Sequence, residues 1–67
     1  MPILNLTMTK EDGGATPEQK KALIAGFTNV FADVMGRGAK TMVVTIQELD
    51  TDSYGIGGET VTDLRKK

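Results

Sequence analysis

The sequence predicts an α/β chain in which a strand, a helix and a second strand follow one another, with a short C-terminal hairpin or strand. Three observations predict this order: a period-two alternation at the start, a helical repeat of apolar side chains, and a β-branched run after it. Such a crossover makes the two strands parallel and right-handed. Two strands and one helix leave much of the sheet bare, and another copy of the chain would cover it.

The first strand is predicted at residues 2–9, PILNLTMT. Leu4, Leu6 and Met8 fall on one face of this segment, and polar residues alternate with them. The segment 10–15, KEDGGA, contains two adjacent glycines and is predicted to be a loop.

The helix is predicted to begin after Thr16. Thr16 suits the N-cap, Pro17 suits the first helical position, and Gln19 completes a capping box. The segment 36–38, Gly-Arg-Gly, ends the helix. One apolar stripe follows the helical spacing and consists of Leu23, Ile24, Phe27, Val30, Phe31 and Val34.

The second strand is predicted at residues 41–46, TMVVTI, as a buried strand, because these residues are mostly β-branched and apolar. The segment 54–61, YGIGGETV, is predicted to form a bend or hairpin and a short final strand. The tail 64–67, LRKK, is predicted to be a solvated end.

The length and composition favour one domain, residues 1–67, that is stabilised by association. Chains below about 70–80 residues usually need disulfides, a metal or oligomerisation. The sequence has no cysteine and no histidine, which excludes a disulfide framework, a zinc site and a Ser/His or Cys/His nucleophile. No metal site and no cofactor are predicted.

The charge and hydropathy patterns exclude other classes. A net charge of −1 argues against a nucleic-acid partner, which requires a basic face. No apolar run approaches the roughly 20 residues of a membrane span. The start of the chain lacks the basic segment and apolar core of a signal peptide. We therefore expect a cytoplasmic protein without a membrane partner.

The glycine-rich run near the C-terminus does not match a phosphate-binding motif. A dinucleotide fingerprint that starts at Gly55 would need a glycine where Thr60 stands, and the lysine of a phosphate loop is absent. A calcium loop that starts at Asp50 would need glutamate at its twelfth position, which is Val61. A tight turn or hairpin is the favoured interpretation. Surface roles are expected for the three remaining candidate acids, Glu18, Glu48 and Glu59.

Met1-Pro2 is the remaining candidate for chemistry. Removal of Met1 would convert Pro2 from an amide into a secondary amine, which is a base and a nucleophile. An α-amino group titrates near 7.7–8.0, and an apolar environment disfavours its charged form, so such a group suits general base catalysis. Taken alone, the two residues favour the simpler interpretation, an ordinary chain start that leads into a strand.

Several segments together resemble the 4-oxalocrotonate tautomerase family of the tautomerase superfamily. They are MPI at the start, TPEQKKALI at the helix start, the strand VVTIQEL, and YGIGGE near the end. The resemblance covers nearly the whole chain. It implies a tautomerase-like β-α-β protomer that assembles as a homohexamer, a trimer of dimers. It further implies a cofactor-independent isomerase of small unsaturated 2-oxo or 2-hydroxy acids, associated with aromatic degradation, with Pro2 as general base.

The resemblance also implies the rest of the site. The aromatic residue before the glycine run, Tyr54, would line a pocket built between subunits, and cations would hold the substrate carboxylate. Prominent members of that family carry arginines after the first strand and on the second strand, where this sequence has Lys10 in a longer loop and Val43. Lys10 is either a carboxylate ligand or a solvated loop residue. Arg37 is a weaker substitute, or a cation at the helix C-terminus.

Two alternatives to the tautomerase hypothesis stay open. The chain could be a non-catalytic structural or regulatory subunit that keeps the fold, because the strand arginine is missing. The same proline chemistry also supports dehalogenation or decarboxylation in relatives. The physiological substrate does not follow from the residues.

Overall fold

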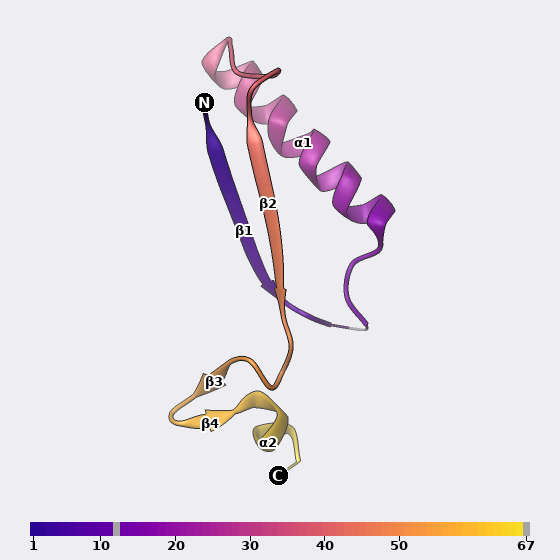
Figure 1. The fold of residues 1–67 in the computed structure, drawn as a ribbon, viewed down its shortest axis with the longest axis vertical. Helices are drawn as coiled ribbons and strands as arrows, with labels where there is room; N and C mark the ends of the chain where they lie inside the picture. Colours follow the sequence, from indigo (N-terminus) through magenta and orange to yellow (C-terminus); the bar gives the residue numbers. More distant parts are fainter. Residues whose placement is uncertain (12, 67) are drawn as a thin grey trace.

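The computed structural model describes residues 1–11 and 13–66. Its elements follow the predicted order, and a hairpin and a short helix come after the second strand (Figure 1). In chain order they are β1 (Ile3–Thr9), α1 (Pro17–Met35), β2 (Val43–Leu49), β3 (Gly55–Ile56), β4 (Glu59–Thr60) and α2 (Val61–Arg65). The predicted α/β class with a C-terminal hairpin is confirmed. The parts of the predicted loop and tail at residues 12 and 67 lie outside the described residues.

The strands β1 and β2 pair in parallel, as the crossover predicted. The register runs from Ile3 opposite Val43 to Thr9 opposite Leu49. Since paired residues of parallel strands share a face, the alternation in β1 is matched across the whole length of β2. The two strands therefore present one continuous face to α1 and one away from it.

The bounds predicted for the second strand from its β-branched run were wrong at both ends, whereas the strand VVTIQEL of the family resemblance coincides with β2. Residues 41–46 were predicted, but the amides of Thr41 and Met42 donate to the Gly38 carbonyl at 3.2 and 2.9 Å and form a turn. The strand instead continues through 47–49, because those residues pair with the end of β1. Partner length thus decides the end of this strand, and side-chain propensity does not.

Both ends of α1 form as the sequence predicted. The Gln19 amide donates to the Thr16 hydroxyl at 3.1 Å, and the Thr16 amide donates to the Gln19 side-chain oxygen at 2.9 Å. At the other end Gly36 adopts φ +71°, and its amide donates to the Ala32 carbonyl at 2.8 Å. A left-handed residue at this place favours glycine, which explains why the helix stops here.

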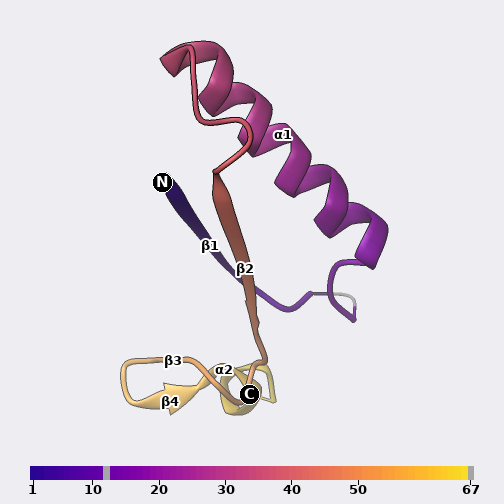
Figure 2. The ribbon, with the colours of Figure 1, turned by 45° about the horizontal axis from the view of Figure 1, so that its top comes forward.

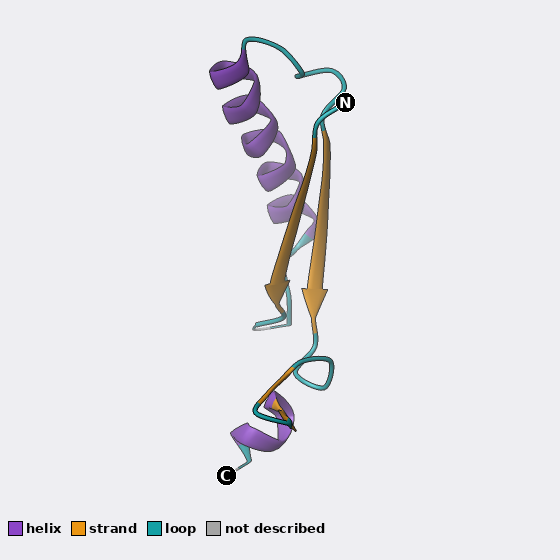
Figure 3. Cartoon of the chain, turned by 90° about the vertical axis from the view of Figure 1, so that its left-hand side faces the viewer, coloured by secondary structure: helices purple, strands orange, loops and turns teal. Residues whose placement is uncertain are grey.

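The helix α1 runs along one side of the two strands, and no described element covers the other side (Figures 2 and 3). Leu4 and Met8 of β1 face this helix, because each lines a hollow together with Phe27. The predicted apolar face of the first strand is therefore turned toward α1, although β2 is the strand that contacts this helix most.

One chain alone leaves much of its apolar surface uncovered. Val30 and Val34 of the apolar stripe are 63% and 78% exposed, and Ile3 of β1 is 61% exposed. Among the described residues, Val61 alone is buried. The predicted burial of the second strand is also incomplete, since its residues are half-buried or exposed. A further surface is needed to complete this core.

The glycine run forms the predicted hairpin. Ile56 pairs with Glu59 in antiparallel fashion, and Gly57 and Gly58 between them have φ values of +64° and +93°. A two-residue loop with two positive φ values is a type I′ turn, which glycine adopts without strain. These glycines therefore turn the chain.

The predicted tail is exposed at Arg65 and Lys66, but Leu64 is half-buried and part of the tail is helical. Leu64 and Arg65 belong to α2, whose N-cap Thr60 accepts the Asp63 amide at 3.2 Å. We call residues 55–65, which comprise β3, β4 and α2, the C-terminal unit. It lies beyond the C-terminal ends of β1 and β2 (Figure 1). The unit therefore projects from the sheet at the end opposite the N-terminus.

Candidate active site

Pro2 lies at the N-terminal end of β1 in apolar surroundings. Its carbonyl accepts the Val43 amide at 2.8 Å, which fixes the residue at the start of the sheet. A Cβ on Gly38 would lie 3.5 Å from Cγ of Pro2 and 2.7 Å from the Phe31 ring. Pro2 also lines a groove of about 560 Å³ whose other members are apolar, among them Met42. The ring is half-buried in this groove.

Arg37 lies at the same end of the molecule as Pro2. It directly precedes Gly38, which is close to Pro2, and its side chain is exposed. It also lies beyond the C-cap Gly36, and the last turn of α1 contains no basic residue. Arg37 therefore directly follows the C-cap, and its two predicted roles, as a carboxylate ligand or as a cation at the helix C-terminus, stay predictions.

Lys10 and Tyr54 lie at the other end of the sheet. Lys10 follows β1 directly, its amide donates to the Leu49 carbonyl at 2.8 Å, and its Nζ is 3.7 Å from Asp50 Oδ1. Tyr54 is half-buried just before β3, and its carbonyl accepts the Val61 amide at 3.0 Å. The structure thus places a cation and an aromatic ring near the C-terminal ends of the strands.

A single chain does not bring all four predicted residues together. Seven-residue strands that rise about 3.3 Å per residue separate the two ends of the sheet by roughly 23 Å. Pro2 and Arg37 lie at one end, and Lys10 and Tyr54 lie at the other (Figure 1). A site that contains both pairs must be built from two chains.

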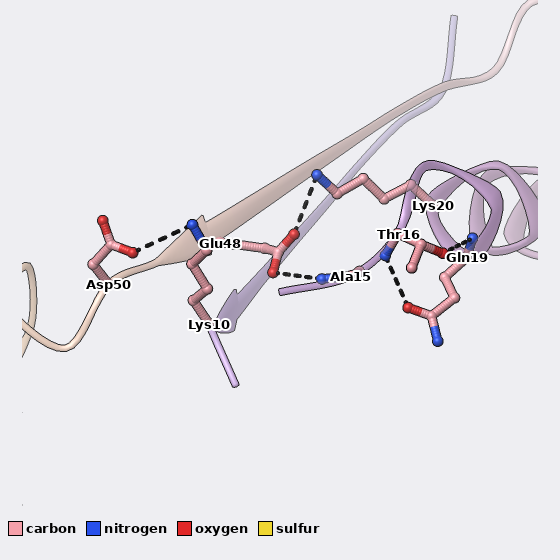
Figure 4. A network of polar contacts seen from close by, with 7 residues as sticks. All are labelled: Lys10, Ala15, Thr16, Gln19, Lys20, Glu48 and Asp50. Atoms are coloured by element: carbon pink, nitrogen blue, oxygen red, sulfur yellow. Dashed lines mark hydrogen bonds and ion pairs between the residues drawn. The ribbon is translucent and has the colours of Figure 1, made fainter. Parts of the chain in front are cut away.

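Glu48 belongs to a polar network that the sequence interpretation missed (Figure 4). One carboxylate oxygen accepts the Ala15 amide at 3.0 Å, and the other is 3.2 Å from Lys20 Nζ. The Glu48 side chain is only 11% exposed, so the predicted surface role is wrong. The pKa of the Glu48 carboxyl lies below its ordinary value of 4.5. The hydrogen bond from the Ala15 N–H contributes most to this lowering, and the contact with Lys20 contributes next.

A signal for Glu48 was present in the strand alternation. Glu48 follows Val44 and Ile46 at a spacing of two, so it occupies the face of β2 that packs on α1. An acid in the apolar phase of a strand requires a partner, because an unpaired buried charge is costly.

Glu11 links the segment after β1 to the C-terminal unit. Arg65 Nη2 lies 3.1 and 3.4 Å from the two Glu11 carboxylate oxygens. The Thr9 hydroxyl also donates to Glu11 at 3.1 Å. The hydrogen bond from Thr9 lowers the pKa of the Glu11 carboxyl most, and the contact with Arg65 lowers it further. This exposed link joins α2 to the residue next to Lys10.

The part of the chain that the structure describes has neither a cluster of metal ligands nor a helix that could span a membrane. Residues 1–11 and 13–66 contain no group of three or more acidic side chains arranged to hold a metal ion. Over the same residues, neither helix has the length and apolar character needed to cross a bilayer.

Comparison with known proteins identifies the family. The family model described as "Tautomerase enzyme" matches residues 2–64. The probable tautomerase K2 of Dickeya dadantii is 49% identical over 67 residues, which cover all of this chain and 97% of that protein. The crystal structure of DmpI from Helicobacter pylori has a TM-score of 0.79 and 41% identity, and the match covers 98% of each chain.

A third relative is described as a hexamer. The structure of a heterohexamer 4-oxalocrotonate tautomerase from Chloroflexus aurantiacus has a TM-score of 0.73 and 26% identity, over 97% of this chain and all of that one. The chain described here belongs to the tautomerase family. The resemblance found in the sequence is confirmed, and so is the tautomerase fold.

Proposed function

We propose that this protein is a cofactor-independent tautomerase of small unsaturated 2-oxo or 2-hydroxy acids, with Pro2 as general base after removal of Met1. The observation that carries the proposal is the place of Pro2 in a tautomerase-family chain: it directly precedes the first strand and is half-buried in an apolar groove. Such surroundings favour the neutral, proton-accepting form of an amine.

The proposed reaction is a proton relay. The neutral Pro2 nitrogen takes a proton from the enol hydroxyl or the acidic carbon of the substrate, which leaves a dienolate and a prolinium ion. The prolinium then returns the proton to another carbon, so atoms and charge balance over the cycle. Lys10, and Arg37 at the Pro2 end, supply the positive charge that holds the substrate carboxylate.

The complete site is proposed to lie between subunits. Pro2 and Arg37 of one subunit would meet Lys10 and Tyr54 of another, because the two pairs lie at opposite ends of one chain. The exposed apolar residues of α1 and β1 supply surface for such an assembly. We propose a homohexamer built as a trimer of dimers, and the description of the Chloroflexus relative as a heterohexamer supports six subunits.

The test is the turnover of the enol form of 4-oxalocrotonate by wild type, Pro2→Ala and Pro17→Ala, with intact mass to verify loss of Met1. General bases contribute about 10²–10⁴-fold, so Pro2→Ala should lower kcat/KM at least about 100-fold. Pro17→Ala is the matched control at the first turn of α1 and should stay within about twofold. Undiminished turnover by Pro2→Ala, with Met1 removed, would overturn the proposal.

A second candidate is a non-catalytic subunit of the same fold. The observation that favours it is Val43 of β2. Its amide donates a hydrogen bond to the Pro2 carbonyl, but its side chain has no positive charge to hold a substrate carboxylate near Pro2. Turnover of a carboxylate-bearing enol by the purified homo-oligomer would eliminate this candidate. An assay of halogenated and decarboxylatable 2-oxo acids in the same series addresses the dehalogenase or decarboxylase alternative.

A further inference from the structure

The network around Glu48 holds the segment that joins β1 to α1. Glu48 stands on β2, yet its two carboxylate oxygens contact Ala15 and Lys20, 33 and 28 residues earlier in the chain. The bond to Ala15 fixes the backbone just before the N-cap of α1. The ion pair with Lys20 fixes the first turns of the same helix, and Figure 4 shows both contacts on one carboxylate.

Gly14 brings this held segment against Lys10. It has φ +92°, and a Cβ on it would lie 2.8 Å from a Glu48 oxygen and 3.2 Å from Cε of Lys10. The aliphatic part of Lys10 therefore packs against Gly14, next to the Ala15 amide that Glu48 holds. This contact positions the methylene groups of Lys10, so the position of its ammonium group depends on the charges nearby.

The charges around Lys10 keep its ammonium accessible. Glu48 is engaged by Lys20 and by the Ala15 amide, and the ion pair of the Lys10 ammonium is with Asp50. Asp50 is 3.7 Å from Nζ of Lys10, but both side chains are largely exposed, and exposed pairs of this kind are weak. An incoming carboxylate can therefore replace Asp50 at the Lys10 ammonium.

We propose that Glu48 is a positioning residue that fixes segment 13–16 and Lys20 and thereby presents Lys10 to the substrate carboxylate. The inference rests on the proposed function, in which Lys10 holds that carboxylate. Glu48 does not touch the substrate in this account. It acts through the backbone at Gly14 and Ala15, and through the charge of Lys20.

A double-mutant cycle tests the proposal with KM for 4-oxalocrotonate as the readout. Lys10→Met and Glu48→Ala should each raise KM, by up to about fivefold for a partly exposed ion pair, with kcat little changed. The double variant should raise KM no further than Lys10→Met alone, because both changes remove one interaction. Effects on KM that multiply would show that Glu48 acts independently of Lys10 and would overturn the proposal.

Conservative variants separate positioning from folding. Glu48→Gln keeps an acceptor for the Ala15 amide, so its KM should lie within about twofold of wild type. Lys20→Met leaves the Glu48 charge without its partner, so it should raise KM, whereas Lys21→Met, on the next residue of the same helix, should not. Equal effects of Lys20→Met and Lys21→Met would contradict the electrostatic part of the proposal.

A second readout does not depend on turnover. In the Pro2→Ala background, 4-oxalocrotonate should protect the Lys10 amine from reductive methylation, as measured by peptide mass spectrometry. Adding Glu48→Ala should remove that protection and leave the labelling of the exposed lysines Lys21, Lys40 and Lys66 unchanged. If Pro2→Ala retains full activity, the proposed function fails. If protection survives Glu48→Ala, the positioning role alone fails.

Discussion

The Glu48 carboxylate keeps its negative charge to lower pH than an ordinary glutamate, because the Ala15 N–H and Lys20 stabilise that charge. A carboxyl whose pKa is lowered by folding stabilises the fold fully above its unfolded value of about 4.5. This contribution is lost as the pH falls through the lower folded value.

We therefore expect Glu48→Gln to be less stable than wild type at neutral pH, and the difference to close as the pH falls below about 4.5. Glu11, whose pKa is also lowered, is present in both proteins and cancels in the difference. Urea unfolding midpoints from pH 7 to pH 3.5 would measure it. A difference that stays constant over this range would show that the Glu48 charge does not contribute.

Single residues were predictable where local chemistry decides their role. The capping function of Thr16 and Gln19 depends on a spacing of three, which is visible in the sequence. The role of Glu48 depends on Ala15, which is distant in the chain and contributes only a backbone amide. A backbone partner leaves no sequence signal, so the alternation of β2 could indicate that a partner exists but not which residue supplies it.

Among the elements, the C-terminal hairpin depends on glycine at a position that lies outside its turn. A Cβ on Gly55 would lie 2.3 Å from the Glu59 carbonyl oxygen, which is main chain and cannot rotate away. We expect Gly55→Ala to lower the free energy of unfolding by about 1–3 kcal/mol, as overpacking does.

Gly26 provides the opposite case and the control. It lies within α1, and a Cβ there would have nothing within 4 Å. Gly26→Ala should raise the free energy of unfolding by about 0.5–1 kcal/mol, since alanine is the better helix former. Both variants are measured by urea unfolding at one fixed protein concentration. Destabilisation by Gly26→Ala, or none by Gly55→Ala, would contradict this account.

Elements with local start and stop signals were predicted better than those defined by pairing. The helix ends at Gly36 as expected, because a left-handed cap is a property of one residue. The second strand extends through 47–49 because β1 reaches that far. The helix α2 was not predicted. It has five residues after its N-cap Thr60, which is too short for a helical repeat of apolar residues to show in the sequence.

On the scale of the whole molecule, the order of elements was predictable and the composition of the site was not. A β-α-β crossover fixes the parallel direction of its strands, so residues before β1 and after β2 must lie at opposite ends. The sequence resemblance implied that Pro2, Lys10, Arg37 and Tyr54 belong to a pocket between subunits, but not that a single chain separates them into these two pairs. How copies join depends on packing of exposed surface, which no local pattern encodes.

Subunit mixing tests the shared site directly. Pro2→Ala and Tyr54→Ala chains should each be impaired as homo-oligomers, because each lacks one part of every site. Unfolding and refolding an equal mixture should restore activity, since some sites then combine Pro2 of one chain with Tyr54 of the other. With random pairing across two-chain interfaces, about a quarter of the sites would be intact.

Refolding each variant separately and then mixing without exchange is the control. Recovery near that fraction requires a site that spans two chains, whereas no recovery in confirmed mixed oligomers would mean that Pro2 and Tyr54 do not act together across an interface.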